Sequence, residues 1–263
     1  MDKDKSQADI TEWQMSGFNQ FIEERLIRGA IDWRRCYFRG QANSDWGLVP
    51  SLLRYNKLPN ECNSWLQFEN LLLEKFKKKG YPLIEEKPTN KLDWLTIAQH
   101  NGLPTRLLDW CESPLHALFF AVENLDHQTD FAVWGYFPER TLSYEKEEID
   151  LTQVDGSCIY LPFHLDSKIT AQQGVFTVHE LPDSSEEVNN EDILITSSYS
   201  LYKFTFDKSL RETIKEELDS MGINHFSLFP SLEGLARNIK WEVEMTNLEE
   251  FFHRRDMKEK FST

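Results

Sequence analysis

Hydrophobic residues in this chain recur at two spacings, one of three to four residues and one of two residues. The longer spacing predicts helices and the shorter one predicts strands. We expect helices at 11–29, 64–79, 92–100, 115–125, 209–220 and 229–239. We expect strands at 35–38, 105–108, 131–137, 157–163, 175–178 and 199–206. Strands scattered among helices without a regular βαβ order predict an α+β domain with a split, mostly mixed or antiparallel sheet surrounded by helices.

The helix predicted at 115–125 has the clearest start signal. Ser113 stands at the N-cap position and Pro114 at the first helical position, an arrangement typical of a helix N-terminus. Apolar residues then follow on almost every side of the helix. A helix of this kind is expected to be central and buried.

Composition and charge narrow the class of protein. The 263 residues carry 29 Lys and Arg against 44 Asp and Glu, a formal net charge of −15. Such a chain repels nucleic acid and anionic membranes at long range, so it would bind a polyanion only through a local basic patch. The sequence contains no run of about 18 apolar residues, so we expect no membrane span. Four widely spaced cysteines and a charged start without an apolar signal segment favour a cytoplasmic protein and no metal site.

Two short stretches carry the candidate chemistry. In the first, an apolar run ends at Arg39 followed by Gly40, and in the second a similar run ends near Asp109. A guanidinium at a strand end, beside a glycine that admits a ligand to the backbone, suits bidentate binding of a phosphate. The alternative is an ion pair between Arg39 and Asp109 that braces the core.

Further candidates flank the second stretch. His100 either contacts a ligand and moves a proton or caps its helix. Trp110 either stacks on a ligand ring or fills the core. Ser113 is chiefly an N-cap, and Arg106 shares the ambiguity of Arg39, whereas Arg54 is more typical of a structural arginine.

Several motifs between residues 38 and 236 together resemble one family. They are Phe38-Arg39-Gly40-Gln41, Trp46-x-Leu48-x-Pro50-Ser51-Leu52-Leu53-Arg54, Gln99-His100-x-Gly102-Leu103-Pro104-Thr105-Arg106-Leu107-Leu108-Asp109-Trp110, Ser113-Pro114-Leu115-x-Ala117-Leu118-x-Phe120-Ala121, Ala171-Gln172-Gln173-Gly174-x-Phe176-Thr177 and Leu228-Phe229-Pro230-x-Leu232-x-Gly234-Leu235-Ala236. This combination is similar to the FRG-domain family, whose members are largely bacterial or phage proteins, some near toxin and anti-phage genes. The resemblance implies an FRG domain at 31–240, a packed helical segment at 1–30 and a charged tail at 241–263.

A more distant resemblance is to ADP-ribosyltransferases, some of which open their first core strand with an aromatic-Arg-Gly motif that holds NAD. It implies an ADP-ribosyltransferase-like core in which NAD contacts Phe38, Arg39, Gly40, Gln41, His100, Arg106, Trp110 and Ser113. Those enzymes carry a catalytic glutamate on a third strand, where this chain has Gln172 and Gln173. The resemblance therefore implies Arg39, Asp109 and Gln173 as the catalytic set.

Two functions remain open from the sequence. The first is a toxin or anti-phage effector that consumes NAD and modifies a macromolecule. The second is a non-catalytic module that binds a nucleotide, another phosphate-bearing small molecule or a phage-derived ligand. A nuclease ranks last, because no cluster of His and carboxylates has metal-ligand spacing.

Overall fold

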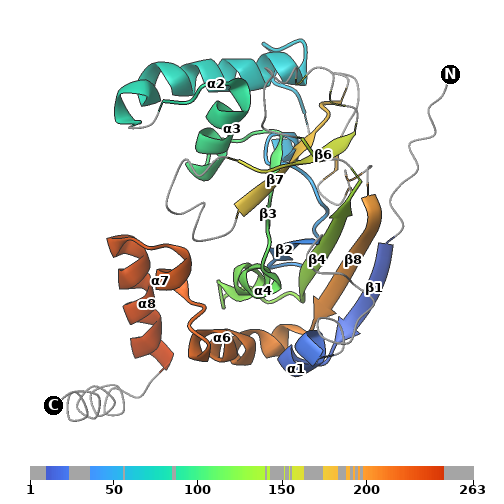
Figure 1. The fold of residues 1–263 in the computed structure, drawn as a ribbon, viewed down its shortest axis with the longest axis vertical. Helices are drawn as coiled ribbons and strands as arrows, with labels where there is room; N and C mark the ends of the chain where they lie inside the picture. The colour runs from blue at the N-terminus through green and yellow to red at the C-terminus, as the bar shows by residue number, and fades with distance from the viewer. Residues whose placement is uncertain are drawn as a thin grey trace.

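We describe a computed structural model of the chain. The described residues are 10–23, 36–55, 57–84, 87–139, 141–142, 151, 154, 156–162, 174–182, 188–189, 192, 195 and 198–245. Within them a single sheet runs through the molecule, with helices packed on it (Figure 1).

The eight-stranded sheet has the order β1-β8-β4-β2-β3-β7-β6-β5. Its strands are β1 (Ile10–Met15), β2 (Tyr37–Gln41), β3 (Leu107–Cys111), β4 (Phe131–Pro138), β5 (Thr141–Leu142), β6 (Ser157–Tyr160), β7 (Gly174–His179) and β8 (Ser198–Phe206). The outer pairs β1–β8 and β5–β6 are parallel, and the pairs between them are antiparallel. The predicted α+β class with a mixed sheet is therefore confirmed.

The helices follow the sequence patterns closely. They are α1 (Phe18–Gln20), α2 (Trp65–Gly80), α3 (Lys91–His100), α4 (Pro114–Val122), α6 (Arg211–Ser220), α7 (His225–Leu228) and α8 (Leu232–Met245), with short 3₁₀ turns η3 (Leu53–Tyr55), η4 (Tyr81–Leu83) and η5 (Lys208–Leu210). The Ser113 hydroxyl accepts from the His116 amide, as its N-cap position predicted. Five of the nine residues of α4 are buried, so the predicted central helix is confirmed.

Two groups of helices cover one face of the sheet (Figure 1). On β3, Leu107 packs with residues of α2 and α3, and Cys111 packs with residues of α4 and α6. Alternate residues of a strand share a face, so Asp109 lies on that same face between the two hydrophobic clusters. Leu108 and Trp110 point to the opposite face, into a third cluster. The fold thus places an acidic residue where neither helical group covers the sheet completely.

Strands β2 and β3 share fewer paired positions than any other neighbouring strands of the described sheet. These strands share one paired position, Phe38 with Cys111, whereas β2 pairs with β4 along its whole length and β3 does the same with β7. The sheet therefore opens between β2 and β3 beyond that pair. The strands nevertheless belong to one sheet, so the predicted split is not seen.

The N-terminal prediction is wrong in part. Residues 10–15, expected to begin a helix, form β1 and pair in parallel with β8. Trp13 stacks on Tyr202 and Phe204 of β8, with ring centroids 5.3 and 5.2 Å apart. This non-local packing outweighs the local helical spacing. The rest of the predicted helix, at 24–29, lies outside the described residues. Near the C-terminus of the chain, α8 continues to Met245, beyond the predicted helix end at 239.

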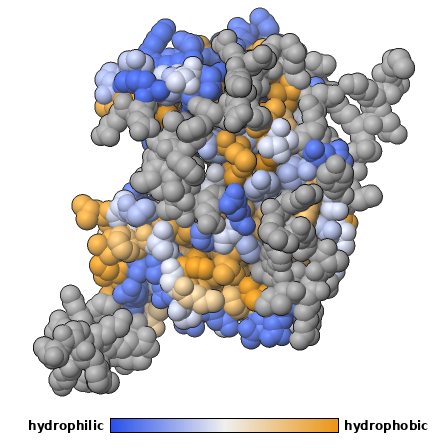
Figure 2. All heavy atoms as spheres, in the orientation of Figure 1, coloured by the Kyte–Doolittle hydropathy of each residue, from blue (hydrophilic) through white to orange (hydrophobic). Residues whose placement is uncertain are grey.

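Exposed apolar side chains gather on α7 and α8, at the left of Figure 2. Phe226, Leu232 and Ile239 are 47%, 86% and 45% exposed. Along α8, by contrast, the buried residues are Gly234 and Asn238. The apolar side chains of these two helices are therefore largely exposed to solvent.

Candidate functional site

Two cavities meet at the opening between β2 and β3. The first has a volume of about 300 Å³ and is lined by Phe38, Arg39, Gly40, His100, Asp109, Trp110, Cys111, Phe120, Gly174, Val175 and Phe176. The second has a volume of about 460 Å³ and is lined by Arg39, Gly40, Gln41, Ala42, Trp46, Gly47, Arg54, Phe120, Glu123, Asn124 and His127. Arg39, Gly40 and Phe120 line both, so the two cavities are adjacent, and we refer to them together as the cleft.

Arg39 lies at the centre of β2 and bridges the open junction to β3. Its NH1 donates a 2.8 Å hydrogen bond to the Asp109 carbonyl, which no pairing with β2 engages. The same nitrogen lies 3.7 Å from Asp109 Oδ2, and the Arg39 side chain is 15% exposed. Its Nε is buried and has no hydrogen-bond partner in the described part of the chain. The guanidinium is therefore only partly satisfied by protein groups. Both residues lie in mid-strand, and the expectation that they end their strands is wrong.

A second arginine increases the positive charge of the cleft. Burial lowers the pKa of Arg39 to about 10; Asp109 opposes this shift, and Arg54 adds to it. Burial also lowers the pKa of Arg54, again opposed by Asp109. Arg54 donates to the Val49 carbonyl at 3.0 Å. Two cations thus share one nearby carboxylate, and an anion entering the cleft would stabilise both charged forms.

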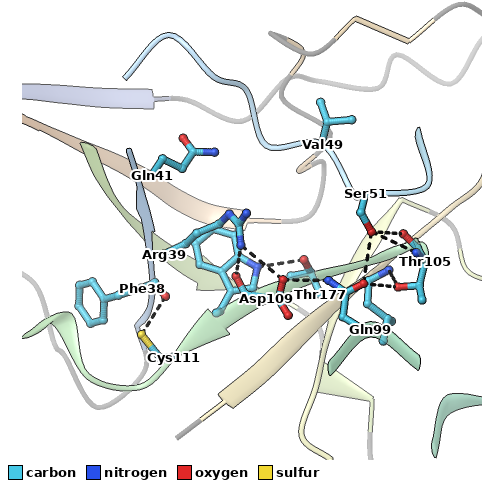
Figure 3. A network of polar contacts seen from close by, with 12 residues as sticks. Phe38, Arg39, Gln41, Val49, Ser51, Gln99, Thr105, Asp109, Cys111 and Thr177 are labelled. Atoms are coloured by element: carbon cyan, nitrogen blue, oxygen red, sulfur yellow. Dashed lines mark hydrogen bonds and ion pairs between the residues drawn. The ribbon is translucent and has the colours of Figure 1, made fainter. Parts of the chain in front are cut away.

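Asp109 is the carboxylate of the cleft, and its side chain is 54% exposed. Gln99 at the end of α3 donates Nε2–H to Asp109 Oδ2 at 2.9 Å (Figure 3). The Gln99 Oε1 accepts from the hydroxyls of Thr105 and Ser51, at 2.7 and 3.3 Å. These two donors fix the orientation of the amide, so Gln99 holds one carboxylate oxygen. Oδ1 is left without a hydrogen bond to the residues that the structure describes.

Gly40 is explained by helix packing. A Cβ added at this position would lie 1.8 Å from the Ala117 carbonyl oxygen and 2.7 Å from the Ala121 amide nitrogen. Both atoms belong to the backbone of α4, which therefore could not approach β2 if any side chain stood here. From the sequence, this glycine was expected to admit a ligand. In the structure it admits the helix that forms a wall of the cleft.

Four other predicted residues lie in or beside the cleft. Phe38, His100 and Trp110 line the first cavity, and Gln41 lines the second. The Trp110 indole donates to Thr177 at 3.0 Å and is 3% exposed, so the ring belongs mainly to the core.

Two predicted residues lie away from the cleft. Ser113 lines neither cavity and caps α4. Arg106 is 1% exposed, and Glu69 of α2 accepts from its Nε and NH2 at 2.7 and 2.8 Å. Its NH1 donates to the Leu151 carbonyl at 3.0 Å. With its guanidinium occupied in this way, Arg106 cannot reach a ligand in either cavity. The expectation of a ligand contact at Arg106 does not fit this geometry.

Gln173, the remaining catalytic candidate, lies outside the described residues. Its neighbour Gly174 begins β7 and lines the first cavity. The sequence analysis did not assign a role to Gln99, Trp46, Phe120 or His127. Gln99 and Phe120 belong to the quoted motifs, and Trp46 stands beside a glycine in a turn, so position alone could not separate a cleft role from a core role.

The described ranges contain neither a metal-binding cluster nor a membrane-spanning helix. Among those residues no three His, Cys, Asp or Glu side chains gather in a way that could hold a metal ion. No helix formed by these residues is both long and apolar enough for a bilayer crossing.

Comparison with known proteins gives one match. No curated protein and no solved structure matches the chain. Residues 34–130 match the family model of the FRG domain. That range includes Arg39, Arg54, Gln99 and Asp109, while the β7 wall of the first cavity lies beyond it. This match supports the resemblance to the FRG-domain family over residues 34–130, about a third of the chain, and the motifs at 171–177 and 228–236 lie beyond it.

Proposed function

We propose that the FRG domain of this chain binds NAD through Arg39 and uses it in an ADP-ribosyltransferase-like reaction. The observation that carries the proposal is the incomplete satisfaction of Arg39, whose buried Nε has no described partner in a cleft that also holds Arg54. An arginine in this state is suited to bind a phosphate with more than one N–H group.

The cleft also offers a group for the chemistry of NAD. In ADP-ribosyl transfer the bond between nicotinamide and ribose C1′ breaks, a nucleophile of the target bonds to C1′, nicotinamide leaves, and the proton of the nucleophile is released. Positive charge develops on the ribose as that bond breaks, and a nearby carboxylate stabilises it. The open Oδ1 of Asp109 would take this role, and Gln173 would hydrogen-bond the ribose.

Such an activity would make the chain a toxin or an anti-phage defence effector that modifies a macromolecule. Induced expression of the wild-type chain in bacteria should then slow growth, and Arg39→Ala should restore it. Equal growth of the two strains, despite equal protein levels, would argue against the toxin role.

A second candidate is a non-catalytic module that binds a nucleotide or a phage-derived ligand in the same cleft. One observation favours it: Asp109 is the sole carboxylate among the described residues that line the first cavity, and it is engaged by Arg39 and Gln99. A carboxylate with such partners could serve only to hold Arg39 in place.

Calorimetric titration with NAD and a chromatographic assay for released nicotinamide separate these functions. We expect NAD to bind the wild type and Arg39→Ala to weaken binding about 10-fold or more, because a hydrogen bond to a charged group is lost. Asp109→Asn should keep binding and lose nicotinamide release. The control is Lys240→Ala, which also removes one positive charge, since the Lys240 side chain is 75% exposed and lines neither cavity. Binding without any release supports the second candidate, and binding unaffected by Arg39→Ala rejects the site.

A further inference from the structure

The second cavity has the features of an aromatic base site. We infer that a dinucleotide spans both cavities, with its diphosphate at Arg39 and Arg54 and the base of its adenylate half on Trp46. This inference rests on the proposed function and adds to it the orientation of the ligand, with the adenylate half in the second cavity.

Trp46 lines the second cavity and is partly exposed to solvent. Its side chain is 46% exposed although it lines a cavity, and its ring meets His127 edge to face, with centroids 6.0 Å apart. A tryptophan left exposed in a concave site offers a large flat surface at little conformational cost. Stacking of a base on such a ring stabilises nucleotide binding.

The loop that carries Trp46 is fixed by internal hydrogen bonds. The Trp134 indole donates to Gln41 Oε1 at 2.7 Å, and Gln41 Nε2 donates to the Gly47 carbonyl at 2.8 Å. On the other side the Ser44 amide donates to the Asp130 carbonyl at 2.8 Å. These bonds join the loop to β2 and β4. Trp46 is therefore in place before a ligand arrives, which reduces the entropic cost of binding.

Charge is arranged to suit a ligand with an anionic centre. Arg39 lines both cavities, and Arg54 lines the second and is close enough to Arg39 to lower its pKa, so the two cations lie near each other. The carboxylate of the second cavity, Glu123, is engaged by His225 at 3.1 Å. A molecule with two ring-bearing arms and a diphosphate between them matches this order of aromatic, cationic and acidic groups. A mononucleotide would leave one cavity unfilled.

Binding of ligand halves tests the assignment. Calorimetric titrations would use ADP-ribose, AMP and nicotinamide mononucleotide on the full chain carrying Trp46→Ala, Trp46→Phe or Arg39→Ala. We expect Trp46→Ala to weaken AMP and ADP-ribose by about 5- to 150-fold, the range for loss of one base stack. Nicotinamide mononucleotide should bind Trp46→Ala as it binds the wild type, and Trp46→Phe should recover most of the lost affinity. Arg39→Ala should weaken all three probes.

The control is Phe226→Ala, because Phe226 of α7 is 47% exposed and lines neither cavity. If Trp46→Ala leaves AMP and ADP-ribose unaffected while Arg39→Ala weakens them, the base site is wrong and the proposed function stands. If Trp46→Ala weakens all three probes equally, the two halves of the ligand do not occupy separate cavities and the inference is overturned. Failure of every probe to bind the wild type overturns both proposals.

Discussion

Arg39 and Arg106 are both arginines in or next to strands of the same sheet, and each lies near a carboxylate from another element. Around Arg106 the protein supplies a partner for each guanidinium nitrogen: the two oxygens of Glu69 and one backbone carbonyl. Glu69 also pairs with Lys91, whose ammonium lies 2.9 Å away. Around Arg39 the protein supplies one carbonyl and one carboxylate oxygen at 3.7 Å, and leaves Nε unpaired in the described part of the chain.

The difference separates a structural arginine from a candidate binding arginine. Burying a guanidinium is costly unless hydrogen bonds and an opposite charge compensate for the lost water. Arg106 receives this compensation from within the protein at each of its three nitrogens, and it lines neither cavity. Arg39 receives part of it and adjoins two cavities, so an external anion can complete its environment.

The largest predicted effect comes from breaking the buried ion pair between Glu69 and Arg106. We expect Glu69→Gln to lower the free energy of unfolding by about 3–5 kcal/mol, because it leaves the charge of Arg106 buried and unpaired. In the cleft, Asp109→Asn should change it by about 1 kcal/mol or less, since Asp109 is largely exposed. Urea unfolding at neutral pH measures both values.

A double variant checks the origin of this loss. Replacing Glu69 and Arg106 together by Leu and Met removes both charges and should recover much of the stability lost in Glu69→Gln. Equal losses in Glu69→Gln and Asp109→Asn would contradict the contrast between the two arginines.

Gly40→Ala tests how the cleft wall is built. We expect this change to destabilise the protein by about 1–3 kcal/mol, because the new Cβ meets backbone atoms of α4 that cannot rotate away. Gly17→Ala is the control: a Cβ there meets no atom within 4 Å, so its effect should stay within about 0.5 kcal/mol. Thermal unfolding of both variants gives the comparison. A stable Gly40→Ala variant would show that α4 can shift, and the packing explanation of this glycine would fail.

Local signals in the sequence predicted the parts of the fold that depend on neighbouring residues. The N-cap at Ser113, the apolar helix after it and the strand at 131–137 all follow from residues a few positions apart. Strand β1 was missed because it is held by stacking of Trp13 on β8, nearly two hundred positions along the chain.

The candidate site was predicted only in part: Arg54 was expected to be structural and Trp46 was given no role, yet both line the second cavity. Arg39 and Asp109 were expected to lie together and do so, but the same reasoning could not separate Arg39 from Arg106. The decisive partner of Arg106 is Glu69, which lies on a different helix 37 positions earlier. The sequence likewise could not reveal Gln99 as a partner of Asp109, since the hydroxyls of Thr105 and Ser51 decide which way its amide faces.

The smallest predicted effect concerns Glu123, the carboxylate of the second cavity. The hydrogen bond from His225 lowers the pKa of Glu123, burial opposes this shift, and the charges of His225, Arg237 and Lys215 add to it. A carboxylate whose pKa is lower in the folded protein contributes stability above its unfolded pKa of 4.5 and loses it as the pH falls through the folded value. Glu123→Gln should therefore cost about 1 kcal/mol or less at neutral pH. This difference from the wild type should vanish well below pH 4.5, as chemical unfolding at the two pH values would measure. A difference that persists in acid, where the carboxyl is neutral, would mean that Glu123 stabilises the fold through packing and not through its charge.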